Sequence, residues 1–212
     1  MSEDDVVARK KAFRKKIRAA IKELTVEETK TQSQQVWDRV IALPEYQSAK
    51  SVGLFLSMPQ GEINTDPILQ HAIQNGKDVY VPKVGEYFEM CDMELLKVVL
   101  EAPDPVFHKS WPKNKWKIPE PPPNMPIVPA KPGELDLLIV PGLGFDKHGH
   151  RLGQGKGYYD RFIARMTLDG VSLPLVAVAL EAQFVDDDIP VGSYDKQMDK
   201  VVLPTRVVLC NK

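Results

Sequence analysis

The chain has 212 residues, 43% of them hydrophobic and 27% charged, with a formal net charge of −1 at pH 7. This length and apolar content suffice for one substantial core, and the slight negative charge argues against a protein that binds nucleic-acid backbones. Its cysteines, Cys91 and Cys210, lie far apart, a spacing that predicts neither a zinc site nor a secreted disulfide framework.

Residues 4–24 have the pattern of an amphipathic helix with a basic side. Apolar residues recur at helical spacing from Val6 to Leu24, and lysines and arginines occupy the other faces. The segment starts acidic and lacks the apolar run of a signal peptide, and no later stretch approaches the about 20 apolar residues that span a bilayer. We therefore expect a soluble, cytoplasmic protein without a membrane partner, with a mitochondrial address as the minor alternative.

The following segments predict a repeating helix and strand pattern. Thr25 is followed three positions later by Glu28, a capping-box pattern that predicts a second helix reaching Leu43. A short apolar strand, a capped helix and another strand are then expected, forming a βαβ unit at residues 51–58, 64–76 and 77–84.

The second half of the chain repeats this rhythm. Residues 135–142 and 174–180 are near-continuous apolar runs, typical of strands covered on both faces, and a helix over 157–166 separates them. The proline-rich residues 117–133 predict an ordered surface loop. The expected fold is one α/β domain over residues 1–212, with three α/β/α layers, a mixed, largely parallel sheet and a site at the carboxyl ends of its strands.

The segment "PGLGFDKHGHRLGQGKGYYD" (141–160) contains a glycine-rich loop, residues 142–160, with the outline of an ATP site. Glycines let consecutive backbone N–H groups face one anion, and the helix that follows adds its partial positive charge. Lys156 and Arg151 can neutralise phosphate oxygens, and Asp160 is placed to hold a magnesium ion. The loop matches neither the Walker A nor the dinucleotide pattern, and a turn that serves only as scaffold is the alternative.

His148 and His150 stand two positions apart in the same loop. Because no carboxylate or cysteine set accompanies them at ligand spacing, we expect loop histidines rather than a metal site.

The glycine-rich segment resembles the signature of the 5-formyltetrahydrofolate cyclo-ligase family, also called methenyltetrahydrofolate synthetases. The segments "ARKKAFRKKIR", "FLSMPQGEINT", "SWPKNKWKIPEP" and "IPVGSYDKQMDKVV" resemble further blocks of that family in the same order. The resemblance implies ATP- and Mg²⁺-dependent cyclisation of 5-formyltetrahydrofolate to 5,10-methenyltetrahydrofolate. The formyl oxygen is phosphorylated, N10 attacks the formyl carbon, and ADP and phosphate are released.

The resemblance also implies roles for individual residues. Catalytic roles fall to Lys156, Arg151 and Tyr158. Nucleotide contacts are implied for Lys10 and Arg14, which share a helix face, and for Arg151, Leu152, Gly153, Gln154, Gly155, Lys156, Gly157, Tyr158 and Tyr159. The folate pocket is expected to comprise Leu56, Met58, Glu62, Trp116, Gln154, Gly155, Lys156, Gly157 and Tyr158, and the magnesium ligands to be Asp160 and Asp195.

Other interpretations of these residues stay open at this point. Leu56 and Met58 also suit an ordinary strand core, and Lys10 and Arg14 a solvated basic face. The rival functions are an ATP-dependent small-molecule kinase and a non-catalytic folate- or nucleotide-binding module. The expected partner is the folate substrate, possibly with a polyglutamate tail, and the expected oligomeric state is a monomer that binds no nucleic acid.

Overall fold

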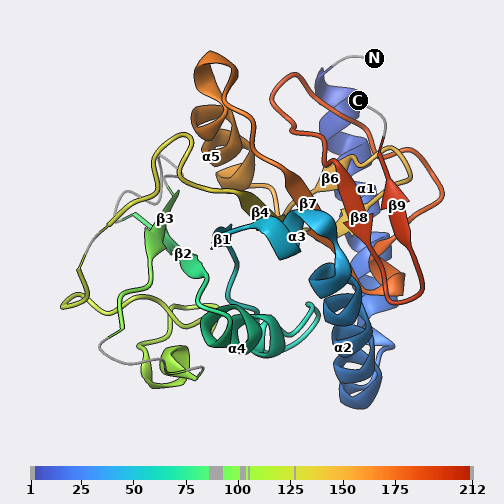
Figure 1. The fold of residues 1–212 in the computed structure, drawn as a ribbon. Helices are drawn as coiled ribbons and strands as arrows, with labels where there is room; N and C mark the ends of the chain where they lie inside the picture. Colours follow the sequence, from blue (N-terminus) through green and yellow to red (C-terminus); the bar gives the residue numbers. More distant parts are fainter. Residues whose placement is uncertain (1–2, 86–92, 101–103, 105, 127, 211–212) are drawn as a thin grey trace.

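The protein is described by a computed structural model that covers all residues except 1–2, 86–92, 101–103, 105, 127 and 211–212 (Figure 1). Cys91 lies outside the described residues. The helices are α1 (Glu3–Lys22), α2 (Val26–Ala42), α3 (Pro44–Ser48), α4 (Asp66–Gln74) and α5 (Tyr158–Met166), with 3₁₀ turns at Phe107–Ser110, Leu168–Gly170 and Glu181–Gln183. The strands are β1 (Ser51–Gly53), β2 (Asp78–Val84), β3 (Met93–Lys97), β4 (Leu137–Val140), β5 (Gly144–Phe145), β6 (Arg151–Leu152), β7 (Leu175–Val178), β8 (Lys200–Val202) and β9 (Val207–Leu209).

The main sheet contains seven of the described strands in the order β3-β2-β1-β4-β7-β8-β9. The central strands β2, β1, β4, β7 and β8 are parallel, whereas β3 and β9 pair antiparallel at the two edges. This confirms the expected mixed, largely parallel sheet. Strands β5 and β6 form a separate antiparallel hairpin after β4.

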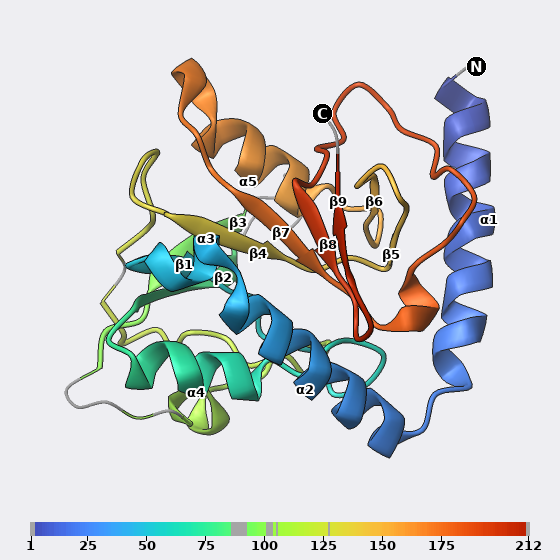
Figure 2. The same ribbon diagram turned by 45° about the vertical axis from the view of Figure 1, so that its right-hand side comes forward.

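Helices cover both faces of this sheet, as the three-layer prediction requires. Figure 2 shows α2 and α4 on one face and α5 on the other. Neighbouring residues of β4 alternate between the two cores: Leu137 packs on the α2 and α4 side, and Leu138 on the α5 side. Both leucines are 0% exposed, and burial of such a side chain stabilises the fold by about 1.5–3 kcal/mol.

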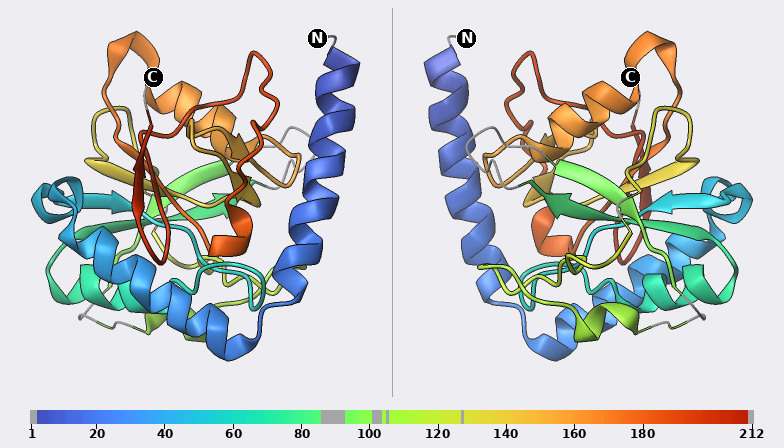
Figure 3. Two further views of the ribbon diagram at one scale, coloured as in Figure 1. Left: turned by 90° about the vertical axis from the view of Figure 1, so that its right-hand side faces the viewer. Right: turned by 90° about the vertical axis from the view of Figure 1, so that its left-hand side faces the viewer.

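Helix α1 lies at the rim of the molecule, apart from the helices that cover the sheet (Figure 3). Its only fully buried residue within the described chain is Ile17, which packs with Leu143, Leu152, Val185 and Ile189. The helix is therefore anchored on the segments that follow β4 and β7 rather than on the sheet itself.

Local signals set the start of α2 as predicted. The Thr25 hydroxyl accepts a hydrogen bond from the Glu28 N–H, and the Glu28 carboxylate accepts one from the Thr25 N–H. The capping box is thus confirmed.

The prediction of a strand over 51–58 is wrong beyond Gly53. The Leu54 N–H still bonds to the Tyr80 carbonyl, but the chain then leaves the sheet. An apolar run does not distinguish a paired strand from a buried extended segment, because both exclude water equally well.

The proline-rich segment runs beside the edge strand β3. The described residues of 117–133 contain no helix or strand, as predicted, and residue 127 lies outside them. The Ala130 N–H donates to the Leu95 carbonyl, and the Val128 carbonyl accepts from the Lys97 N–H, both at 2.8 Å. The segment therefore covers an otherwise unpaired sheet edge.

None of the helices in the described part of the chain is long and apolar enough to cross a membrane.

Candidate active site

The candidate site lies where the strand order reverses, between β1 and β4. From β1 the chain proceeds to β2 on one side, and from β4 to β7 on the other. Segments that leave the carboxyl ends of two such strands diverge and form a ligand crevice. A cavity of about 470 Å³ occupies this place and is lined from both segments, by Phe55, Leu56, Met58, Glu62, Pro141, Gly142, Leu143, Arg151, Gly153, Gln154, Lys156, Gly157, Tyr158 and Tyr159. We call it the apolar cavity.

The β5–β6 hairpin holds the first part of the glycine-rich loop in place through Asp146. This carboxylate is 0% exposed and accepts hydrogen bonds from the backbone of His148, His150 and Ile189. His150 Nδ1 lies 2.8 Å from Asp146 Oδ2, and His148 Nε2 lies 3.2 Å from Asp188. Both histidines therefore stabilise the turn, in agreement with their prediction as loop residues.

The second part of the loop depends on glycine at two positions. Gly155 has φ +102° and Gly157 has φ +66°, both in the left-handed region that side chains disfavour. Gly157 directly precedes α5, so the loop delivers its backbone to the N-terminus of that helix. Lys156 stands between these glycines with an exposed side chain that lines the apolar cavity.

Arg151 and Asp160 form a largely buried ion pair beneath the loop. Arg151 Nη2 lies 2.6 Å from Asp160 Oδ2, and the two side chains are 5% and 14% exposed. Arg151 Nη1 also donates to the Pro141 carbonyl at 3.3 Å, and its guanidinium lies 5.6 Å from the centre of the Tyr159 ring. The arginine thus connects the end of β4, the glycine loop and α5.

Three basic residues of α1, spaced four apart, face the glycine loop and the neighbouring Asp195. Lys10 Nζ pairs with Asp195, Arg14 Nε donates to the Gly153 carbonyl at 2.9 Å, and Arg18 Nη2 donates to Gln154 Oε1 at 2.7 Å. Burial and the neighbouring Arg18 lower the pKa of Arg14. The structure thus brings the predicted Arg14 to the glycine loop and Lys10 to Asp195, and it adds Arg18 at the loop, which the sequence interpretation missed although it continues the same spacing.

The two predicted magnesium ligands lie close together. Asp160 Oδ1 accepts the N–H of Lys196, the residue after Asp195, and each carboxylate is already paired with a cation, Arg151 or Lys10. The described residues contain no cluster of three or more metal-ligating side chains. Two carboxylates nevertheless fit Mg²⁺, which commonly takes one or two protein oxygens together with phosphate and water.

Glu62 is one of two acidic residues that line the apolar cavity, the other being Glu120. The Glu62 carboxylate accepts the Met58 N–H at 2.9 Å. Burial raises the pKa of Glu62 to about 7, although this hydrogen bond opposes the shift. A carboxyl group that exchanges its proton near neutral pH is therefore placed beside apolar walls.

Some of the remaining predicted residues line the apolar cavity and others do not. Trp116 lines the apolar cavity with 38% of its surface exposed, and Leu56 lines it while also belonging to the core. Leu152 is 1% exposed and packs with Ile17, so its side chain serves the core and only its backbone faces the loop. The predicted residues that do not line this cavity are Lys10, Arg14, Leu152, Gly155, Asp160 and Asp195.

Sheet order, switch-point cavity and glycine loop together define an α/β protein with a glycine-rich loop beside an apolar pocket, an arrangement typical of ligand-binding sites. Residues 6–204 match the model of the 5-formyltetrahydrofolate cyclo-ligase family. The chain is 31% identical over 194 residues to the mouse (Mus musculus) 5-formyltetrahydrofolate cyclo-ligase, covering 91% of this chain and 92% of that protein. It is 30% identical to the Arabidopsis thaliana mitochondrial 5-formyltetrahydrofolate cyclo-ligase, covering 97% and 77%.

A solved structure, the Aquifex aeolicus 5,10-methenyltetrahydrofolate synthetase, is similar throughout. It superposes with a TM-score of 0.75 at 28% identity, covering 96% of this chain and 93% of that one. The chain belongs to the 5-formyltetrahydrofolate cyclo-ligase family and is an enzyme. The resemblance seen in the sequence is confirmed.

Proposed function

We propose that this protein converts 5-formyltetrahydrofolate to 5,10-methenyltetrahydrofolate with ATP and releases ADP and phosphate. The observation that carries this proposal is that one cavity is lined both by the Glu62 carboxylate with its apolar surroundings and by Lys156 of the glycine-rich loop. This cavity can therefore hold a flat heterocycle next to a phosphate group. The names of the similar proteins support this reaction.

The chemistry explains why ATP is needed. The N5-formyl group is an amide, whose resonance makes its carbon a poor electrophile and its oxygen electron-rich. The formyl oxygen attacks the γ-phosphorus and ADP leaves. N10 then attacks the activated carbon, its proton is lost, and the C–O bond breaks to release phosphate. The protein contributes orientation and charge neutralisation.

Residues at the glycine loop suit the phosphate side of this reaction. Lys156, exposed to the cavity, neutralises the transferred phosphoryl group, while the buried Arg151 holds the loop and α5 in register. On α1, Arg14 contacts the Gly153 carbonyl of the loop and Lys10 pairs with Asp195, and these two residues bind the rest of the nucleotide. Asp160 and Asp195 would hold Mg²⁺, which when bound neutralises phosphate charge.

Residues of the apolar cavity suit the folate side. A pterin has flat apolar faces and a donor edge, so Met58, Trp116 and Tyr158 provide walls and Glu62 accepts a hydrogen bond from the amino edge.

Further parts of the proposal are that residues 1–212 act as one domain, that the enzyme is a cytoplasmic monomer, and that its folate substrate can carry a polyglutamate tail.

The test is the absorbance of the methenyl product after mixing the purified protein with 5-formyltetrahydrofolate at neutral pH. We expect a rise that requires both ATP and Mg²⁺. Lys156→Ala is compared with Lys147→Ala, because Lys147 lies in the β5–β6 turn, pairs with Asp188 and does not line the cavity. No rise with the unaltered protein contradicts the proposal; a stable phosphorylated product then indicates a kinase, and binding without turnover a binding module.

A further inference from the structure

One wall of the apolar cavity is a short turn that carries an exposed tryptophan. The turn contributes Asn114, Trp116, Ile118, Pro119 and Glu120 to the lining of the cavity. Trp116 has 38% of its surface exposed, and the Nζ of Lys115 lies 4.7 Å from the centre of its ring. Because so much of this side chain is exposed, the direction of its backbone decides where the ring lies more than burial does.

Asn114 fixes the backbone of this turn. Its Oδ1 accepts the Trp116 N–H at 2.9 Å and the Ile118 N–H at 3.1 Å. Its own N–H donates to the Ile118 carbonyl at 2.9 Å, and its carbonyl accepts the Lys117 N–H at 2.8 Å. Its Nδ2 donates to Glu120 Oε1 at 2.9 Å. One asparagine therefore bonds to Trp116 and to both residues that follow it.

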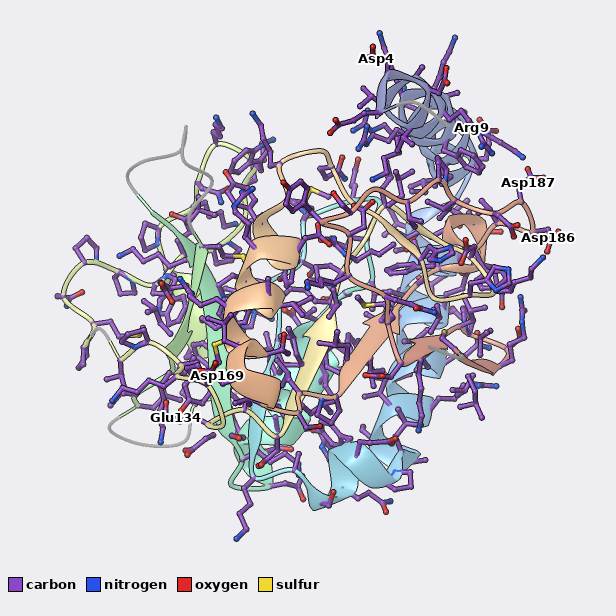
Figure 4. The ribbon with its side chains drawn as sticks, turned by 90° about the horizontal axis from the view of Figure 1, so that it is seen from above. Asp4, Arg9, Glu134, Asp169, Asp186 and Asp187 are labelled. Carbon is purple, nitrogen blue, oxygen red and sulfur yellow. The ribbon has the colours of Figure 1, made fainter. Side chains whose placement is uncertain are left out.

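The turn also holds a backbone conformation that its sequence disfavours. Lys117 has φ +63°, in the left-handed region, and among the described residues other than glycine only Asp169, at φ +57°, shares this feature. Figure 4 shows Asp169 at the end of α5 that lies away from the glycine loop. Aspartate tolerates the left-handed region better than lysine does. Lys117, directly after Trp116, therefore depends on the hydrogen bonds of Asn114 to keep its conformation.

We propose that Asn114 is a positioning residue that holds Trp116 in the wall of the apolar cavity and thereby sets the affinity for the folate. This inference rests on the proposed function, which makes Trp116 a wall for the pterin. A ring that is already in place costs less conformational entropy when the substrate binds. The asparagine therefore acts through the tryptophan, and its effect falls on the folate rather than on ATP.

A double-mutant cycle tests whether Asn114 acts through Trp116. In the methenyl assay, we expect Asn114→Ala to raise the KM for 5-formyltetrahydrofolate about three- to tenfold, the range that lost hydrogen bonds produce. The values of kcat and of the KM for ATP should stay unchanged. In a Trp116→Ala background, Asn114→Ala should raise the KM for the folate by less than about twofold, because the group that it positions is absent.

Asn75→Ala is the matched control for this cycle. Asn75 is an exposed asparagine at the end of α4, its Nδ2 donates to the His71 carbonyl at 2.8 Å, and it does not line the cavity. This variant also loses an asparagine side chain that bonds to the backbone, and its KM for the folate should equal that of the unaltered protein.

A second pair of variants tests the amide of Asn114. Asn114→Asp keeps an acceptor for the two N–H groups but places a carboxylate beside Glu120, so the KM for the folate should rise. Adding Glu120→Gln supplies an amide donor to the new carboxylate and reverses the direction of the hydrogen bond. The double variant should therefore have a lower KM for the folate than Asn114→Asp alone.

Two results overturn the inference. One is an unchanged KM for the folate in Asn114→Ala. The other is an equal fold-increase with and without Trp116, which means that Asn114 contacts the folate itself or supports the fold in general. If the unaltered protein does not turn over, the proposed function fails separately. Calorimetric dissociation constants of 5-formyltetrahydrofolate for the proteins of the cycle then replace the KM values, with the same expected ratios, and absence of folate binding overturns the inference as well.

Discussion

Placing α1 against the glycine loop requires glycine at residue 144. A Cβ added at Gly144 would overlap Ile17 Cδ1 and would lie 3.4 Å from the Gln183 carbonyl. Ile17 is 1% exposed and is the anchor of α1, so it cannot turn into solvent without losing its packing. Gly144→Ala should therefore destabilise the fold by about 1–3 kcal/mol, as overpacked cores do.

The same geometry predicts a specific rescue. Ile17→Val removes the Cδ1 methyl, the nearest atom, whereas Cγ1 would lie at an ordinary 3.6 Å. Alone, Ile17→Val should cost about 0.5–1.5 kcal/mol. In the double variant the overlap is absent. Its loss of unfolding free energy should therefore be at least about 1 kcal/mol smaller than the sum of the losses of the two single variants.

Urea unfolding of the four proteins measures this coupling, and the KM for ATP reports whether α1 has shifted. Because Lys10 and Arg14, the residues proposed to bind the nucleotide, both lie on α1, Gly144→Ala should raise that KM and the added Ile17→Val should restore part of it. Strict additivity of the unfolding free energies would refute the argument that Ile17 Cδ1 fixes the distance between α1 and the hairpin.

Three further predictions concern the site. Lys156→Ala should lower kcat/KM about 100-fold or more in the methenyl assay, with unchanged thermal unfolding because the side chain is exposed. Arg151→Met should cost about 3–5 kcal/mol in urea unfolding by leaving Asp160 as an unpaired carboxylate, and adding Asp160→Asn should recover part of it. Since burial raises the pKa of Glu62 to about 7, kcat/KM for the folate should rise with pH as this carboxyl ionises, and Glu62→Gln should lose that limb; an unchanged profile argues against Glu62 as the acceptor.

The features that the sequence predicted well are local ones. Thr25 and Glu28 are three residues apart and need no tertiary information to form a capping box. Lys10 and Arg14 are four residues apart and fall on one face of any α-helix, so spacing alone predicts that their side chains point to the same side of α1. Their roles in binding stay predictions.

The features that the sequence did not reveal depend on long-range convergence. A cavity of about 940 Å³ is lined by Lys30 from α2 and by Lys113 from a loop, and no spacing rule relates these two residues. The His108–Asp66 pair joins residues 42 apart in the chain for the same reason. Strands β8 and β9 are three residues each, too short for periodicity to distinguish them from loop.

The position of α1 has a consequence for how the protein is made. Its hydrogen bonds join Arg14 to a residue 139 positions later and Lys10 to one 185 positions later. The helix therefore leaves the ribosome long before the surface on which it docks is synthesised. A nascent chain therefore carries an amphipathic helix with an uncovered Ile17 until Val185 and Ile189 have been synthesised, and chains that terminate before Asp195 lack the ion-pair partner of Lys10.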